Sequence, residues 1–266
     1  MNLARRRLTS SSNPVGRILR EVGSSRRAAS AIVGAALACV VSVIPPAPAR
    51  GDMITFVTPT GSTTGGQPVN ATVTITTSLN TVTVALTNLQ ADPTSDVQNV
   101  NGLVFSFSNF NPTTASITGN SGIVDRTVNG NGTFSDASAT TTDWLVSVTT
   151  TPAPAKITLT TIGNSHAPQT VIGSPNSGTG IYSNANSSIA GSNHNPFLAD
   201  TPVFTLHVQG VTASTDVGSV IFAFGTADTT TNVVTGHAVP EPSSLALAAL
   251  GGGACLAIRR RRARRR

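Results

Sequence analysis

Cysteine is almost missing from this chain of 266 residues, which contains only Cys39 and Cys255. Each of them lies inside a terminal run of apolar residues, so neither is placed to crosslink the middle of the chain. This excludes a fold held by a disulfide framework and sites built from paired cysteine ligands. A hydrophobic core must therefore stabilise the middle of the chain.

Positive charge is scarce between the two ends. From residue 51 to residue 238 the only cations are Arg126 and Lys156, against nine aspartates and no glutamate, which gives a net charge of −7. The formal charge of +6 for the whole chain arises from arginines near its two ends. An acidic middle without interleaved basic and aromatic residues repels nucleic-acid phosphates, which excludes nucleic acid as a partner.

Motifs that carry a known chemistry are also missing. The four histidines have no spacing that binds a metal or orients a nucleophile: His166, His194, His207 and His237. There is no HExxH motif, Gly-x-Ser-x-Gly elbow, glycine-rich phosphate loop or calcium loop. A glycosidase needs two opposed carboxyl groups, and the sequence brings no two aspartates together. We expect no enzymatic activity, no cofactor and no metal site, and a secreted hydrolase is the most distant alternative.

Aromatic residues make up only 4% of the chain, whereas sugar-binding β-domains usually present an aromatic platform. Trp144 alternates in phase with Val146 and Val148, which predicts that it lies in the core. Tyr182 is the better candidate for an exposed aromatic contact. A carbohydrate-binding module of the cell envelope is therefore an alternative function.

The middle of the chain is rich in strands in which apolar residues alternate with threonine. This alternation covers residues 72–76 and 81–86. Further apolar runs cover residues 103–107, 144–148, 157–162, 203–208 and 220–224. Clusters of Gly, Asn, Pro and Ser separate them, and helical periodicity is missing. The pattern predicts an all-β fold, an antiparallel β-sandwich of jelly-roll or immunoglobulin-like type. His207 alternates with its apolar neighbours and is expected to face solvent.

Turn signals predict the connections between these strands. The pairs at residues 101–102, 129–130 and 131–132 are Asn-Gly, which suits turns with positive φ. Residues 150–155 contain two prolines and are an alternative linker between two small domains, although we expect one domain. Residues 163–200 are too long for a structureless loop, so we expect short strands around Ile181–Tyr182 and Phe197.

The amino end is similar to a secretory signal. A basic region extends through Arg27, an apolar run covers residues 28–44, and Ala47 and Ala49 supply the small residues that signal peptidase requires. We expect export through a translocon and cleavage after Ala49. An uncleaved anchor is the alternative, and the arginine pairs permit the twin-arginine route as well as the general one. Cys39 is interpreted as a small hydrophobic residue, not a lipid attachment site.

The carboxyl end combines three features in a fixed order. Pro240, Glu241 and Pro242 come first, and an apolar run covers residues 245–258. The run is followed by Arg259, Arg260, Arg261, Arg262, Arg264, Arg265 and Arg266. A helix over residues 243–258 would rise about 24 Å, short of a hydrocarbon core of about 30 Å. The arginines compensate by fixing this end on the cytoplasmic side, which places the domain outside.

This order resembles the PEP-CTERM sorting signal, in which a Pro-Glu-Pro motif precedes a short hydrophobic helix and an arginine cluster. The resemblance implies a Gram-negative-type bacterium and an exosortase, a membrane enzyme that removes the tail and passes the protein to the envelope or exterior. Such proteins tend to accompany extracellular polysaccharide and biofilm systems. An ordinary tail anchor is the alternative.

These observations predict three segments: a signal peptide at 1–49, an extracellular β-sandwich domain at 50–238, and a sorting signal with a transmembrane helix at 239–266. The predicted function is that of an exported structural protein of the cell surface or extracellular matrix, sorted by exosortase after transient anchoring in the inner membrane. The expected partners are signal peptidase, the export translocon, exosortase and the membrane, and extracellular polysaccharide is a further candidate.

Overall fold

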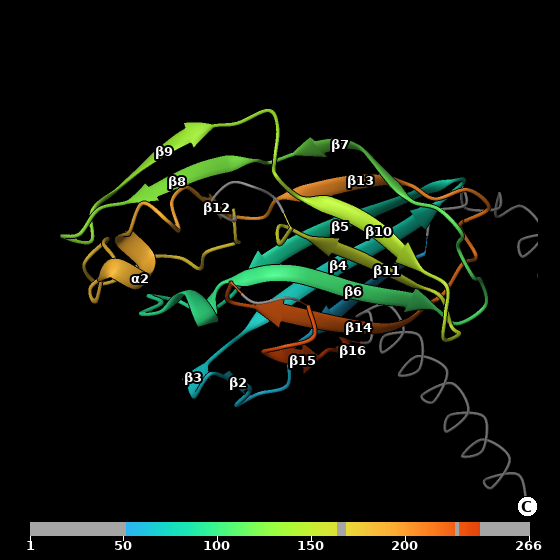
Figure 1. The fold of residues 1–266 in the computed structure, drawn as a ribbon, viewed down its shortest axis with the longest axis horizontal. Coiled ribbons are helices and arrows are strands. Elements are labelled where there is room, and N and C mark those ends of the chain that lie inside the picture. Colours follow the sequence, from blue (N-terminus) through green and yellow to red (C-terminus); the bar gives the residue numbers. More distant parts are fainter. Residues whose placement is uncertain (1–51, 164–168, 227–228, 240–266) are drawn as a thin grey trace, which may run out of the picture. The chain divides into compact units, whose positions relative to one another are not determined.

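The computed structural model describes residues 52–163, 169–226 and 229–239. These residues form a mostly β structure of antiparallel sheets, as the sequence predicts (Figure 1). The expected signal helix and C-terminal hydrophobic helix lie outside the described residues. Within the described ranges, no helix has the length and apolar character that crossing a membrane requires.

The largest sheet contains six strands, and the two strands predicted from the threonine-rich alternation form a hairpin within it. In spatial order its strands are β16 (His237–Val239), β1 (Met53–Val57), β4 (Ala71–Ser78), β5 (Thr81–Asn88), β13 (Val203–His207) and β7 (Ser116–Ser121). In β4 and β5 Val73, Ile75, Val82, Val84 and Leu86 are buried, and the residues between them are partly exposed. This is the period of two expected where one face of a sheet packs on a core.

A second sheet contains five strands. In spatial order these are β10 (Leu145–Thr149), β11 (Lys156–Thr160), β6 (Val100–Phe107), β14 (Val217–Phe224) and β15 (Val233–Thr235). Residues 150–155, which the sequence left open as a domain linker, join β10 to β11, and these two strands are hydrogen-bonded neighbours. The central strand β6 is almost completely buried, and β14 is buried over most of its length except at Gly218 and Ser219.

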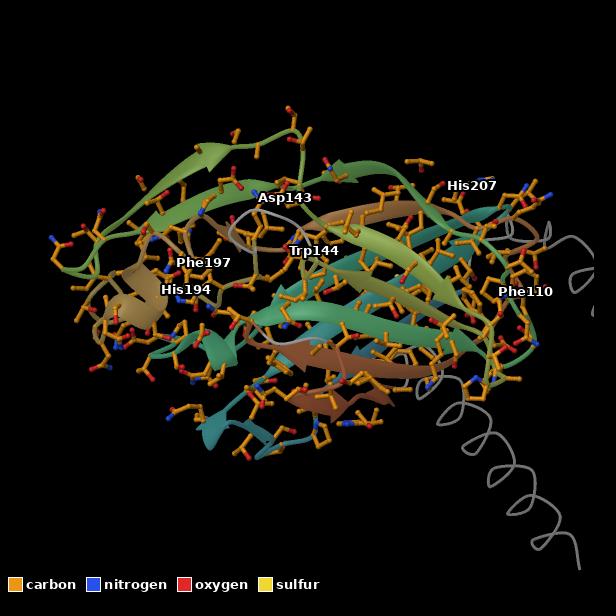
Figure 2. The ribbon with its side chains drawn as sticks, viewed as in Figure 1. Phe110, Asp143, Trp144, His194, Phe197 and His207 are labelled. Atoms are coloured by element: carbon orange, nitrogen blue, oxygen red, sulfur yellow. The ribbon has the colours of Figure 1, made fainter. Side chains whose placement is uncertain are left out.

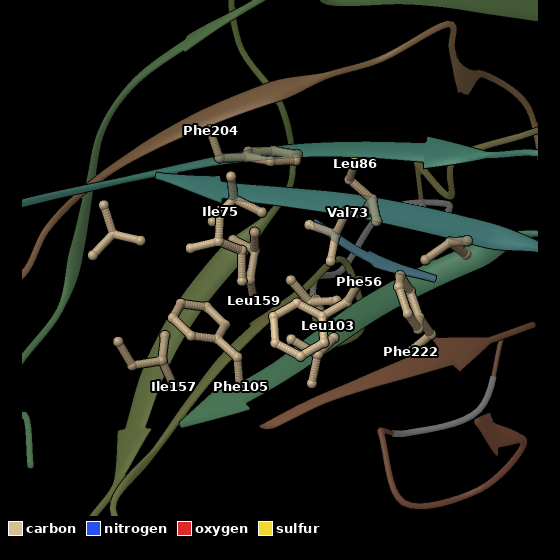
Figure 3. Close-up of a cluster of buried hydrophobic side chains, with 14 of the residues drawn as sticks. Phe56, Val73, Ile75, Leu86, Leu103, Phe105, Ile157, Leu159, Phe204 and Phe222 are labelled. Carbon is tan, nitrogen blue, oxygen red and sulfur yellow. The ribbon is translucent and has the colours of Figure 1, made fainter. Parts of the chain in front are cut away.

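The two sheets share one hydrophobic core (Figure 3). Side chains of β4, β5 and β13, such as Ile75, Leu86 and Phe204, face those of β6 and β11, such as Phe105 and Leu159. Full burial of each such side chain stabilises the fold by about 1.5–3 kcal/mol. This core supplies the stability that disulfides do not.

Outside the main core lies a smaller lobe. It consists of a three-stranded sheet, β12 (Phe197–Ala199), β8 (Val124–Val128) and β9 (Phe134–Ser138), and the short helix α2 (Ser187–Ala190). The lobe has its own buried cluster, which includes Val128, Tyr182 and Phe197. A two-stranded sheet of β2 (Thr63–Thr64) and β3 (Gln67–Pro68) and the 3-10 helix η2 (Asp96–Gln98) complete the described elements.

The predicted turns have mixed outcomes. Gly132 has a φ of +82° between β8 and β9, so the turn at residues 131–132 is confirmed. The prediction of a turn at residues 101–102 is wrong, because both residues are part of β6. Gly102 serves close packing instead, since a Cβ at this position would approach the Thr229 methyl group to 2.9 Å. A strand forms around Phe197, but the one expected around Ile181–Tyr182 does not.

Candidate functional site

The residues predicted to direct sorting and processing lie outside the described residues. They are Pro240, Glu241 and Pro242, the seven terminal arginines, and Ala47 and Ala49. Their individual roles therefore stay predictions. The structure does describe the strand from which the sorting segment leaves the domain, and this strand is the first candidate site.

That strand is β16, the exposed edge strand of the six-stranded sheet. It pairs antiparallel with β1, and Val239 lies opposite Thr55 and His237 opposite Val57. A proline has no backbone N–H, so a chain with prolines at 240 and 242 has no donors there for the ladder with β1. The edge strand therefore leads directly into the sorting motif, with no spacer between them.

Gly236 fixes the position of β16. It joins β15 of the five-stranded sheet to β16 of the six-stranded sheet, and its N–H donates to the Val220 carbonyl at 2.9 Å. A Cβ at this position would lie 2.9 Å from the Phe222 ring and 3.4 Å from the Phe56 side chain. Glycine is needed because the chain crosses from one sheet to the other in contact with core aromatic rings.

The second candidate site is the Arg126 cluster, which we define as Arg126, Phe134, Asp136 and Tyr182. Arg126 on β8 donates from Nε and Nη2 to the two carboxylate oxygens of Asp136 on β9, at 2.8 and 2.7 Å. Its Nη1 donates to the Tyr182 hydroxyl at 3.2 Å, and this hydroxyl donates to the Gly173 carbonyl at 2.8 Å. The guanidinium also stacks 4.2 Å from the centroid of the Phe134 ring.

These contacts shift the pKa values of the cluster. The hydrogen bond from Arg126 lowers the pKa of Asp136 below the usual aspartate range. Burial raises the pKa of the Tyr182 hydroxyl, because a phenolate would lose its hydration there. On the neighbouring residue Asp125, burial raises the pKa of the carboxyl, and the charge of Asp143 adds to this shift.

We expect the fold to lose stability in acid, because protonation of Asp136 removes its ion pair with Arg126. Because the pKa of Asp136 is depressed in the fold, its contribution is present above the unfolded pKa and is lost as the pH falls below about 4. The raised pKa of Asp125 acts in the opposite direction, so the comparison should be made between the wild type and Asp136→Asn. Urea midpoints at pH 6 and pH 3 should differ more in the wild type. Equal losses in both proteins would contradict this assignment.

The structure also tests the isolated candidates. Trp144 is 3% exposed, so its predicted core position is confirmed, and His207 is exposed as expected. The prediction that Tyr182 is an exposed aromatic residue is wrong, because Tyr182 is 1% exposed inside the lobe. Figure 2 shows His194 beside α2 and His207 at the opposite end of the sheets. His237 lies on β16, and His166 is outside the described residues.

Asp92 and Asp96 connect their segments to residues that are distant in sequence. Asp92 accepts from the Ser183 N–H at 2.7 Å and from the Asn176 amide at 3.1 Å. Asp96 accepts from the Ser188 hydroxyl at 2.9 Å. No group of three or more His, Cys, Asp or Glu side chains gathers in a metal-binding arrangement among the residues that the structure describes.

An antiparallel β-domain that ends in an edge strand followed by a Pro-Glu-Pro segment, an apolar run and arginines has the organisation of an exported protein with a C-terminal sorting tail. Comparison with known protein families matches residues 238–262 to the PEP-CTERM protein-sorting motif. The chain thus carries the C-terminal sorting signal of exosortase substrates, and exosortase is its processing partner. Proteins with this motif are exported and held transiently in the membrane before release to the surface or exterior.

The match begins at Ala238, inside β16, and includes Pro240, Glu241, Pro242 and the first four of the seven arginines. Comparisons with curated proteins and with solved structures found no match.

Proposed function

We propose that the mature protein is a structural component of the cell surface or extracellular matrix, a β-sandwich domain that acts by association and not by catalysis. Signal peptidase frees the amino end after Ala49, and exosortase cuts the sorting tail near residues 240–242. The observation that carries this proposal is that the sorting motif starts inside the edge strand β16. The product of processing is therefore the β-domain itself, with almost no chain beyond it.

The surface of the domain supports a role outside the cell. Between residues 51 and 238 the charge is −7, and the partly exposed faces of β4 and β5 consist mainly of threonine hydroxyls. A net charge away from zero limits self-association through sheet edges such as β16, β7 and β9. Hydroxyl-rich surfaces suit contact with a hydrated polysaccharide.

The proposal predicts that the protein remains with the matrix while polysaccharide is present. In cells that make extracellular polysaccharide, most of the processed protein should sediment with the cells and matrix. In cells that lack the polysaccharide but keep the exosortase, the same processed protein should move to the culture fluid, as measured by immunoblotting of both fractions. An identical distribution in the two strains would contradict the matrix role.

A further inference from the structure

We propose that a cavity between the main core and the smaller lobe binds a single neutral sugar ring. The cavity, which we call the Asp200 cavity, has a volume of about 330 Å³. Its lining residues come from parts of the chain that are distant in sequence: Thr87, Arg126, Ile172, Ser174, Asp200 and Thr201. Such binding would be how the proposed matrix protein holds polysaccharide, so it rests on the proposed function and names its ligand class.

The size of the cavity fits a small ligand. Ligand sites in proteins commonly have volumes of about 300–1,000 Å³, so this cavity lies near the lower limit. One sugar ring of a polysaccharide fits that volume better than an extended oligosaccharide. Leu89, which also lines the cavity and is 47% exposed, contributes apolar surface that suits the C–H groups of a sugar ring.

Arg126 gives the cavity fixed hydrogen-bond donors. A guanidinium has five N–H groups, and three of these are used on Asp136 and Tyr182. One N–H on Nη1 and one on Nη2 are not used in these bonds. The ion pair and the Phe134 ring hold the guanidinium in place. Hydrogen bonds from these N–H groups to a ligand therefore cost little conformational entropy.

Asp200 contributes an acceptor in a strained backbone position. It directly follows β12 and has a φ of +61°, which is uncommon for a residue other than glycine. Asp200 is exposed, and within the described part of the chain its carboxylate makes no hydrogen bond and no ion pair, so its oxygens are open to a ligand.

The remaining polar groups are hydroxyls. The Thr87 and Thr201 hydroxyls lie 2.8 Å apart and form a hydrogen bond with each other. Ser174 adds a further hydroxyl to the lining. Hydroxyls both donate and accept, so they adapt to the hydroxyls of a sugar in either sense.

The charges around the cavity disfavour an anionic ligand. Asp136 already balances the charge of Arg126, and Asp200 adds a negative charge, so an anion is disfavoured. A sugar satisfies both groups, because its hydroxyls donate to the carboxylate and accept from the guanidinium in charge-assisted hydrogen bonds.

The test uses the processed protein recovered from its host, with glucose, galactose, mannose and N-acetylglucosamine as probes. Ligand-observed NMR and calorimetry should show saturable binding of at least one of these sugars. Asp200→Asn keeps the shape of the side chain and tolerates positive φ, and it should weaken binding about tenfold or more. Asp52→Asn, which changes an exposed aspartate outside the cavity lining, is the matched control and should leave binding unchanged.

Three results would overturn the sugar site. These are no binding of any of the four sugars, equal binding by the wild type and Asp200→Asn, or saturable binding of acetate or ammonium at the cavity in place of a sugar. Thermal unfolding of both variants shows whether they are folded. The localisation experiment above is scored separately, so a protein that is sorted correctly but binds no sugar contradicts the site and leaves the sorting intact.

Discussion

Replacing Trp144 by alanine should lower the free energy of unfolding by about 3–5 kcal/mol, as is typical for large aromatic side chains in a core. The indole is 3% exposed, and its ring centroid lies 4.9 Å from that of Phe204 on the six-stranded sheet. Its Nε1 donates to the Gln169 carbonyl at 2.8 Å. The variant therefore loses core packing and leaves a buried carbonyl without its donor.

The neighbouring residue provides the control for this variant. Leu145 is 47% exposed, so Leu145→Ala should change stability by no more than about 0.5 kcal/mol. Trp144 is the only tryptophan of the chain, so its replacement removes the fluorescence signal of unfolding. Urea unfolding of both variants should therefore be followed by circular dichroism. Similar small losses in the two variants would mean that Trp144 does not lie in the core.

Replacing Arg126 by alanine should cost about 2–4 kcal/mol. Removing one partner of a buried ion pair typically costs about 3–5 kcal/mol, and we expect less here because the Asp136 side chain stays 36% exposed. The variant also leaves the buried Tyr182 hydroxyl without its donor and removes the stacking on Phe134. The lobe should open first, which limited proteolysis between residues 169 and 200 would detect.

Lys156 supplies the control, because it is exposed and is the only other cation between residues 51 and 238. Lys156→Ala should leave both the urea midpoint and the proteolysis pattern unchanged. If Lys156→Ala and Arg126→Ala have the same effect, general charge balance explains it and the Arg126 cluster is not a stabilising unit.

The strands that the sequence predicts best are those that pack on the main core. In β4 and β5 the core-facing residues are apolar except Thr77 and Asn88, because one face of each strand lies on that core. The strands β7 and β9 contain mainly serine, threonine, asparagine and aspartate at exposed or partly exposed positions, so no apolar period marks them. They form because neighbouring strands supply hydrogen-bond partners, which a single sequence does not show.

The same contrast applies to the sites. A sorting tail depends on residues that are close in sequence, so its proline, apolar and arginine segments are readable without a structure. The Asp200 cavity combines residues 87, 126, 174 and 200, which only the fold brings together. The burial of Tyr182 depends on the fold in the same way, because Arg126 and Gly173 provide the polar partners that allow its hydroxyl to be buried.

Mass spectrometry of the exported protein's C-terminus tests the central claim most directly. In cells with an active exosortase, we predict that the protein outside the cell ends near residues 240–242 and lacks residues 259–266. Without the exosortase, the same domain should stay in the membrane with its arginines attached. Recovery of the intact arginine cluster on extracellular protein from exosortase-competent cells would contradict the account.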